Sequence, residues 1–276
     1  MPKSLDRFYD GSLSGNDSEG RFGTAFARFL GGLFHVLARV LFRYEVVNPE
    51  ALWSFKGKKN GAVLVAPHVS YVDAVMMFLA PRPKNWVRLM GKSDLFTCAG
   101  GLLGKIVARV GAFPVNRDSA DTTAIKRASR MLKNGELVGL FPEGTRRGKG
   151  NVDPSLHGGA ALIARMGKAP LIPVGMSGVG EIKRPGERVR FPKVRIVVGE
   201  PYALSSFSFL PKEDRLDGAT WFVMRQAFAL SRGCDPESVD MHELFPASKD
   251  FSKVFSSHEI SPVDVSALPE FKLEEK

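Results

Sequence analysis

The sequence has little cysteine, no secretory signal and no long uncharged apolar run. Its two cysteines, Cys98 and Cys234, form no C-x-x-C pair, a pattern that favours two reduced thiols over one long-range disulfide. Residues 1–20 are polar and rich in Ser, Gly and Asp, which excludes a signal peptide within them. No uncharged apolar stretch reaches the roughly 18–20 residues of a membrane span, so we expect no transmembrane helix.

Basic residues outnumber acidic ones. The 276 residues include 39 Lys or Arg and 29 Asp or Glu, a net charge of +10. Residues 202–276 carry 8 basic and 13 acidic residues, a net charge of −5, which leaves +15 for the preceding part. A basic body of this kind indicates a polyanionic partner: nucleic acid, an anionic membrane or a phosphorylated substrate. The hydrophobic content of 44% excludes a wholly disordered chain.

Residues 21–45 are predicted to form a membrane-tethering helix behind a flexible leader, residues 1–20. On a helix over residues 21–43, four arginines and His35 fall within roughly an 80° arc, and Phe-rich apolar side chains occupy the opposite face. A basic stripe opposite an aromatic face is typical of a helix that lies in a membrane interface. The alternative is an ordinary helix packed on its own domain. Gly31 and Gly32 lower the stability of this helix in either case.

Beyond Pro49, short apolar strands alternate with helices. This alternation predicts an α/β fold with a mixed, largely parallel central sheet flanked by helices. The predicted strands are residues 62–66, 111–115, 137–141, 171–174 and 189–198, the last bent at Pro192. The predicted helices are residues 71–79, 101–109, 122–133, 156–166 and 221–230. We expect one domain over residues 46–232, followed by a peripheral acidic extension over residues 233–276 that loses periodicity from residue 246.

A histidine and an aspartate follow the first predicted strand, in the stretch P-H-V-S-Y-V-D of residues 67–73. The carboxyl ends of strands are where α/β proteins place ligand sites. Ser70 and Asp73 also fit a helix cap, in which Asp73 complements the helix N-terminus. On one regular helix the side chains of His68 and Asp73 would diverge by about 140°. They meet only if His68 precedes the helix and folds back over its first turn; the alternative is a loop histidine with no catalytic role.

Three other stretches carry candidate site residues. F-P-E-G-T-R, residues 141–146, follows a strand and combines a flexible glycine, a hydroxyl and a guanidinium suited to phosphate. G-x-F-x-V-x-R ends in Arg117, and P-L-I-P-V, residues 170–174, is an apolar strand with two prolines. Taken singly, these stretches also fit a charged surface turn, a solvated strand end and plain core.

In this order the four stretches resemble the sequence blocks of the glycerolipid acyltransferase superfamily. The resemblance is strongest to its 1-acyl-sn-glycerol-3-phosphate (lysophosphatidic acid) acyltransferase family. G-K-S-D-L-F at residues 91–96 and V-G-E-P at residues 198–201 match as well, so the resemblance spans about residues 62–201. Pro67 is a departure, because the family usually has asparagine before the histidine.

The resemblance implies an O-acyltransferase. It would move a fatty acyl group from acyl-CoA or acyl carrier protein to the sn-2 hydroxyl of 1-acyl-sn-glycerol 3-phosphate, giving phosphatidic acid. His68 would be the general base and Asp73 would orient its ring. Pro173 would line the acyl path. The residues implied to bind the substrate phosphate are Arg117, Glu143, Gly144, Thr145 and Arg146.

No cofactor or metal is expected, since the H-E-L-F stretch at His242 lacks the second histidine of a zinc site. The expected partners are an anionic membrane, a lysophospholipid acceptor and acyl-CoA or acyl carrier protein. The expected location is the cytoplasmic face of a membrane, peripheral or monotopic. The basic residues lack interleaved aromatic platforms, which argues against nucleic acid. Two alternatives remain: an acyltransferase that uses glycerol 3-phosphate, another lysophospholipid or a glycolipid, and a non-catalytic module that binds anionic lipid.

Overall fold

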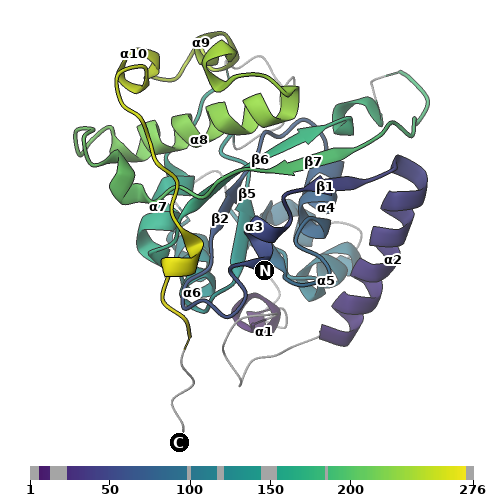
Figure 1. The fold of residues 1–276 in the computed structure, drawn as a ribbon. Helices are drawn as coiled ribbons and strands as arrows, with labels where there is room; N and C mark the ends of the chain where they lie inside the picture. Colours follow the sequence, from purple (N-terminus) through teal and green to yellow (C-terminus); the bar gives the residue numbers. More distant parts are fainter. Residues whose placement is uncertain are drawn as a thin grey trace, which may run out of the picture.

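A seven-stranded sheet with helices on both faces forms the body of the molecule (Figure 1). The computed structural model describes residues 6–12, 24–97, 101–116, 121–143, 154–183 and 186–271. The strand order is β1-β7-β6-β2-β5-β3-β4, and only β6 and β7 pair antiparallel among the described strands. The predicted α/β class with a mixed, largely parallel sheet is therefore confirmed. The strands are β1 (Glu45–Val47), β2 (Val63–Val65), β3 (Val87–Lys92), β4 (Phe113–Val115), β5 (Leu137–Leu140), β6 (Leu171–Ser177) and β7 (Arg195–Val198).

The helices connect these strands and cover both faces of the sheet. The α-helices are α1 (Asp6–Asp10), α2 (Thr24–Phe42), α3 (Glu50–Trp53), α4 (Val72–Leu79), α5 (Leu102–Arg109), α6 (Thr122–Lys133), α7 (Gly159–Gly167), α8 (Arg215–Arg232), α9 (Met241–Leu244) and α10 (Ser252–Phe255). The described 3-10 helices are η2 (Ser93–Phe96), η4 (Val179–Glu181), η5 (Leu204–Phe207), η6 (Pro236–Ser238) and η7 (Val265–Ala267).

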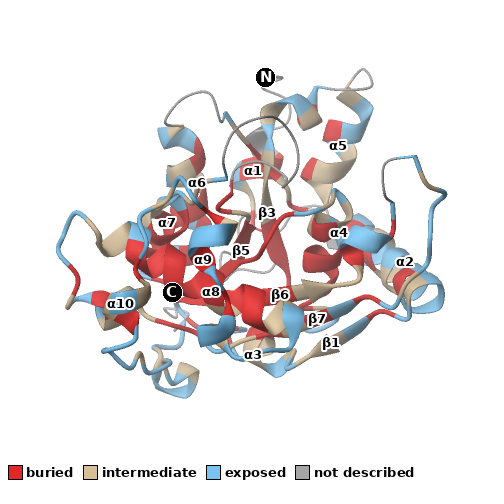
Figure 2. Cartoon of the chain, turned by 90° about the horizontal axis from the view of Figure 1, so that it is seen from above, coloured by how far each residue is buried: buried red, intermediate tan, exposed pale blue. Residues whose placement is uncertain are grey.

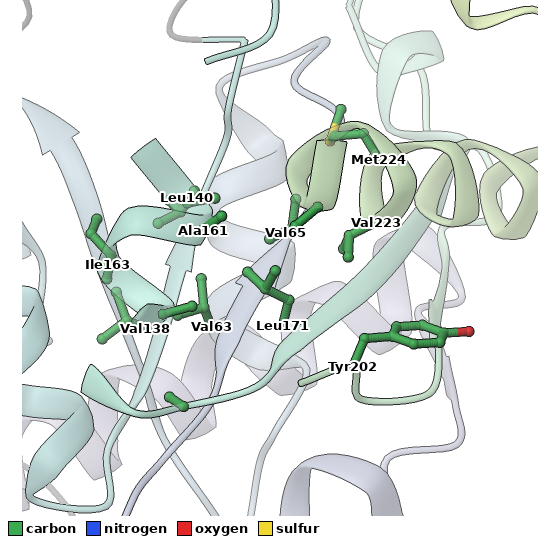
Figure 3. Close-up of a cluster of buried hydrophobic side chains, with 14 of the residues drawn as sticks. Val63, Val65, Val138, Leu140, Ala161, Ile163, Leu171, Tyr202, Val223 and Met224 are labelled. Carbon is green, nitrogen blue, oxygen red and sulfur yellow. The ribbon is translucent and has the colours of Figure 1, made fainter. Parts of the chain in front are cut away.

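The central strands divide the core into two layers, because successive residues of a strand face opposite sides of the sheet. Val63 and Val65 of β2 pack with residues of α6, α7 and α8, whereas Leu64 packs with residues of α4. Figure 3 shows the first layer, where β2 and β5 meet Ile163 of α7 and Met224 of α8. Buried residues concentrate between these two helix layers (Figure 2). The continuous apolar run predicted for β2 thus reflects burial on both faces.

Helix α2 packs one face on the domain and exposes the other. Ala27 and Ala38 are buried, and a Cβ on Gly31 would lie 2.4 Å from the Arg82 guanidinium. Gly31 is therefore needed for the close approach of Arg82, whose Nη2 donates to the carbonyl of Arg28 at 3.1 Å. The exposed face carries Phe26, Phe29, Leu33, Phe34, Val36, Leu37, Val40 and Leu41.

The structure adds one observation to the expectation that the chain has no transmembrane helix. Residues Ala25–Phe42 are long and apolar enough to cross a membrane, by length and composition alone. This window contains Arg28 and Arg39, so it was not found when the sequence was searched for uncharged apolar runs. It is the one such helix in the described part of the chain.

The predicted flexible leader is wrong for residues 6–12, which dock into the core. Phe8 and Tyr9 are almost fully buried. The buried Arg88 of β3 donates to the carbonyls of Phe8, Tyr9 and Gly11, at 2.9, 3.2 and 2.7 Å. Arg88 also forms a buried ion pair with Glu136 at 3.2 Å. A buried arginine thus satisfies the backbone of a short segment that has little helix-forming strength of its own.

The predicted peripheral extension also differs from the structure. Phe245, Phe251 and Phe255 are buried in the core layer that includes α8, and Phe255 stacks on Trp221 with ring centroids 5.5 Å apart. After α10 the chain (yellow in Figure 1) returns to the body of the molecule, where Lys59 donates its backbone N–H to the Pro269 carbonyl at 2.8 Å. Residues 233–271 therefore belong to the domain's packing, although the composition of this segment is acidic.

One predicted strand is half wrong, and two strands, β1 and β3, were not predicted. Strand β7 begins at Arg195, so residues 189–194 lie outside the sheet, where Pro192 lacks the N–H that a ladder uses. Strand β1 has only three residues and starts within the predicted tether segment. Strand β3 contains the buried Arg88, which interrupts its apolar pattern. The other predicted elements are present with shifted ends.

Candidate active site

The candidate site lies at the carboxyl ends of β2 and β5. These strands are parallel neighbours, with Val65 of β2 in register with Leu140 of β5. His68 follows β2 and Glu143 follows β5, so the topology brings two of the predicted residues to one edge of the sheet. This is the edge where α/β folds place ligand sites.

His68 and Asp73 meet as the sequence requires. His68 precedes α4, and its Nδ1 lies 3.0 Å from Oδ2 of Asp73, which is fully buried. The same oxygen accepts the backbone N–H groups of Val69 and Ser70 at 2.6 and 2.7 Å. Ser70 Oγ in turn accepts the N–H of Val72 at 3.2 Å, so Ser70 caps the turn that opens α4 from one residue before the N-cap position, which Tyr71 occupies. One carboxylate therefore fixes both the loop and the ring.

The contact with Asp73 also indicates which tautomer a neutral His68 ring adopts. A carboxylate accepts hydrogen bonds and cannot donate, so Nδ1 of His68 carries the proton directed at Asp73. In the neutral ring Nε2 is then the acceptor nitrogen. The His68 side chain is 11% exposed, which leaves it accessible at the edge of a largely buried site.

Two contacts of His68 could not be read from the sequence. Glu143 accepts the backbone N–H of His68 at 3.2 Å, and the ring of Phe141 stacks on the imidazole, with centroids 4.2 Å apart and planes 20° from parallel. Both residues belong to the F-P-E-G-T-R stretch, so this stretch supports the histidine. The position of this stretch directly after a strand indicated a role in the site. Nothing in the sequence indicated that Phe141 and Glu143 would contact His68.

The rest of the predicted site is placed only in part. Arg117, Gly144, Thr145 and Arg146 lie outside the described residues. Arg117 follows β4, and the other three residues follow β5. Strand β3 lies between β4 and β5, so these two strands are not adjacent in the sheet. At about 4.8 Å per strand, their ends are about 10 Å apart.

Pro173 lies in β6, in register with Val65 of β2. It is buried, and a Cβ on Gly199 would lie 2.8 Å from its ring and 2.8 Å from Leu230 of α8. Its surroundings are therefore apolar and belong to the α8 side of the sheet. Among the described residues, no group of three or more His, Cys, Asp or Glu side chains is arranged to hold a metal ion.

Comparison with known proteins supports the resemblance seen in the sequence. The model of the family described as "Acyltransferase" matches residues 43–177, which include His68, Asp73, Phe141 and Glu143. A 1-acyl-sn-glycerol-3-phosphate acyltransferase of Bacillus subtilis is 34% identical over 161 residues, covering 58% of this chain and 76% of the relative. The chain belongs to the 1-acyl-sn-glycerol-3-phosphate acyltransferase family. It is an O-acyltransferase.

Other members agree with this assignment. A 1-acyl-sn-glycerol-3-phosphate acyltransferase of Streptococcus pneumoniae is 34% identical over 146 residues, covering 48% of this chain and 52% of the relative. The crystal structure of the 1-acyl-sn-glycerophosphate acyltransferase of Thermotoga maritima shares the fold, with a TM-score of 0.55 and 23% identity. That match covers 77% of this chain and 82% of the other.

Replacing Phe141 by leucine is expected to lower kcat of this acyltransferase about 3- to 10-fold, with little change in KM. The stacked ring restricts the imidazole, and aromatic pairs contribute about 0.5–1.5 kcal/mol beyond burial. Steady-state kinetics of acyl transfer measure the effect. The matched control is Phe209→Leu, which removes an equivalent stack on His258 with centroids 4.2 Å apart. Equal losses in the two variants would contradict a role for the Phe141 stack.

Proposed function

We propose that this acyltransferase moves a fatty acyl group from acyl-CoA or acyl carrier protein to the sn-2 hydroxyl of 1-acyl-sn-glycerol 3-phosphate, giving phosphatidic acid. The observation that carries the proposal is the 3.0 Å contact between His68 and buried Asp73 at the end of β2. The names of the relatives in Bacillus subtilis and Streptococcus pneumoniae support this acceptor.

In the proposed mechanism His68 is the general base. Nε2 removes the proton of the acceptor hydroxyl as its oxygen attacks the thioester carbonyl carbon. The new C–O bond forms, the C–S bond breaks, and the imidazolium returns the proton to the departing thiolate. Asp73 holds the ring through Nδ1 and stabilises the imidazolium, as the aspartate of a serine-protease triad does. No covalent acyl-enzyme and no cofactor enter this scheme.

We assign the acceptor phosphate to Arg117, Glu143, Gly144, Thr145 and Arg146. Arginine forks and backbone N–H groups suit a phosphate dianion. Glu143 is the member with a described contact, and this contact is to the His68 backbone. Glu143 therefore connects the proposed phosphate loop to the base, and we give it a positioning role. Pro173, in its apolar surroundings, is assigned to the wall of the acyl path.

We further propose that α2 lies in the interface of an anionic membrane, at its cytoplasmic face. Its outward face is apolar, while Ala27, Gly31 and Ala38 pack on the domain. A spanning helix is surrounded by lipid or by other spanning segments, whereas one side of α2 contacts the catalytic domain. The product carries two acyl chains, so a site beside lipid suits its release.

The test is an acceptor panel with purified protein and labelled acyl-CoA or acyl carrier protein. We expect turnover on 1-acyl-sn-glycerol 3-phosphate to exceed that on glycerol 3-phosphate, on other lysophospholipids and on a glycolipid. Preference for another acceptor would replace the proposed one while leaving the acyl-transfer chemistry intact. Failure on every phosphate-bearing acceptor would remove the phosphate role of Arg146. Vesicle binding with no turnover on any acceptor would favour the non-catalytic module.

A further inference from the structure

The stretch between η4 and β7 is basic and exposes two large apolar side chains. Val189 and Phe191 are 55% and 52% exposed. The exposed basic residues of its described part, residues 186–195, are Arg188, Arg190, Lys193 and Arg195. Glu187 pairs with Arg190 at 2.6 Å, and Lys193 pairs with Glu45 of β1 at 2.7 Å. We call residues 186–195, which include the first residue of β7, the basic loop; its ten residues carry four basic groups and one acidic group.

The basic loop is fixed to the C-terminal end of α2. The rings of Phe191 and Phe42 are 5.4 Å apart, and Arg43 Nη2 donates to the Phe191 carbonyl at 3.2 Å. The backbone N–H of buried Val194 donates to the carbonyl of Phe42 at 2.9 Å. These contacts hold Phe191 at the surface without burying it. The exposed position of the Phe191 side chain is therefore fixed by backbone hydrogen bonds on either side of it.

The apolar surface of α2 continues onto this loop. Val40 of α2 is 72% exposed, two residues before the Phe42 that contacts Phe191. Figures 1 and 2 both place the loop beside the end of α2. At its other end the loop follows η4, where a Cβ on Gly180 would lie 3.6 Å from the side chain of Val69, the residue after His68. The loop therefore lies at the end of α2, and η4, which precedes it in the chain, lies beside Val69 at the rim of the candidate site.

We propose that the basic loop is a second membrane-binding element, in which Phe191 and Val189 enter the lipid interface while Arg188 and Arg190 bind phospholipid phosphates. Exposed apolar side chains flanked by basic ones complement an anionic lipid surface. The proposal rests on the interfacial position proposed for α2, since the two elements share one continuous surface. With two points of contact, the membrane fixes the tilt of the domain and brings the rim beside Val69 to the lipid.

The test measures binding of the full chain to vesicles of phosphatidylcholine, with and without about 30% phosphatidylglycerol. We expect Arg188→Ala with Arg190→Ala to weaken binding to the anionic vesicles about 25-fold, since each basic residue near such a surface contributes about 5-fold. Phe191→Ser is expected to weaken binding to both vesicle types about 5-fold, and Phe191→Leu to keep most of the binding because it remains apolar. Thermal unfolding confirms that each variant is folded.

The matched control is Arg165→Ala with Met166→Ser on α7, which removes one exposed basic and one exposed apolar residue elsewhere. Equal weakening by this control would overturn the proposal. A direct readout is Phe191→Trp with lipids brominated in their acyl chains. Stronger quenching than in the wild type, and than in Met166→Trp, supports insertion; unchanged quenching refutes it.

Two further outcomes separate this proposal from the function proposed above. If Val40→Ser on α2 weakens vesicle binding and the loop variants do not, the loop proposal fails and the interfacial α2 stands. If the loop variants bind vesicles normally but raise KM for acyl carrier protein, the loop is a carrier-docking surface and the lipid proposal fails. Turnover on a water-soluble short-chain acceptor reports the acyl-transfer chemistry independently of both.

Discussion

Replacing His68 by alanine is expected to reduce acyl transfer about 10³-fold while leaving vesicle binding unchanged. General-base catalysis contributes roughly 10²- to 10⁴-fold, and His68 is the described imidazole held by a buried carboxylate at the end of a central strand. The loss should appear in kcat, because the ring is assigned to proton transfer and not to acceptor binding. Turnover of labelled acyl-CoA with 1-acyl-sn-glycerol 3-phosphate measures it.

The matched control for this variant is His242→Ala. His242 is an exposed histidine on α9, so its loss removes an imidazole without touching the site. We expect full activity in the control. Unchanged turnover in His68→Ala would exclude His68 as the base. Loss of both turnover and vesicle binding would indicate misfolding, which circular dichroism and thermal unfolding detect.

Replacing Arg88 by methionine is expected to lower the free energy of unfolding by about 3–5 kcal/mol. The change removes the guanidinium that pairs with buried Glu136 and donates to the carbonyls of Phe8, Tyr9 and Gly11. Urea unfolding followed by circular dichroism measures the loss. Arg88→Lys, which keeps the charge but not the forked geometry, is expected to lose less.

The control is Arg130→Met, which removes an exposed ion pair with Asp10 on the same N-terminal segment. An exposed pair contributes at most about 1 kcal/mol, so this variant should unfold almost as the wild type does. In Arg88→Met with Glu136→Leu, part of the loss should be recovered, because the buried carboxylate that lost its ion pair is removed as well. A loss in Arg88→Met no larger than in Arg130→Met would show that the buried pair does not hold the N-terminal segment.

The elements that the sequence predicts well are those with local causes. Strands β2 and β5 are short apolar runs buried on both faces, and α6 carries its own cap, in which Asp121 accepts the N–H of Ala124. Helix α1 has no such local signal. It is held by Arg88, 77 positions away from Gly11, so its docking depends on a contact that no window of the sequence contains. Strand β3 was not predicted either, because a buried arginine breaks its apolar pattern. The partners that allow Arg88 to be buried are distant in the sequence.

The candidate site also combines features that the local sequence predicts with features that depend on the strand order. The meeting of His68 and Asp73 follows from spacing, a strand end and a helix start, all of which are local. The support from Phe141 and Glu143 depends on β5 lying beside β2, which is a property of the strand order. The separation of β4 from β5 by β3 is likewise a matter of topology, and periodicity carries no information about it.

The pairing of β1 with β7 sets the order in which the protein can assemble during synthesis. Helix α2 and β1 leave the ribosome first, whereas Arg195 of β7, the partner of Glu45, follows 150 positions later. At about 5–20 residues per second this delay is roughly 8 to 30 s. Throughout it, α2 lacks the strand and the basic loop that fix its C-terminal end. We therefore expect the nascent chain to meet lipid or a chaperone through α2 before its catalytic domain has closed.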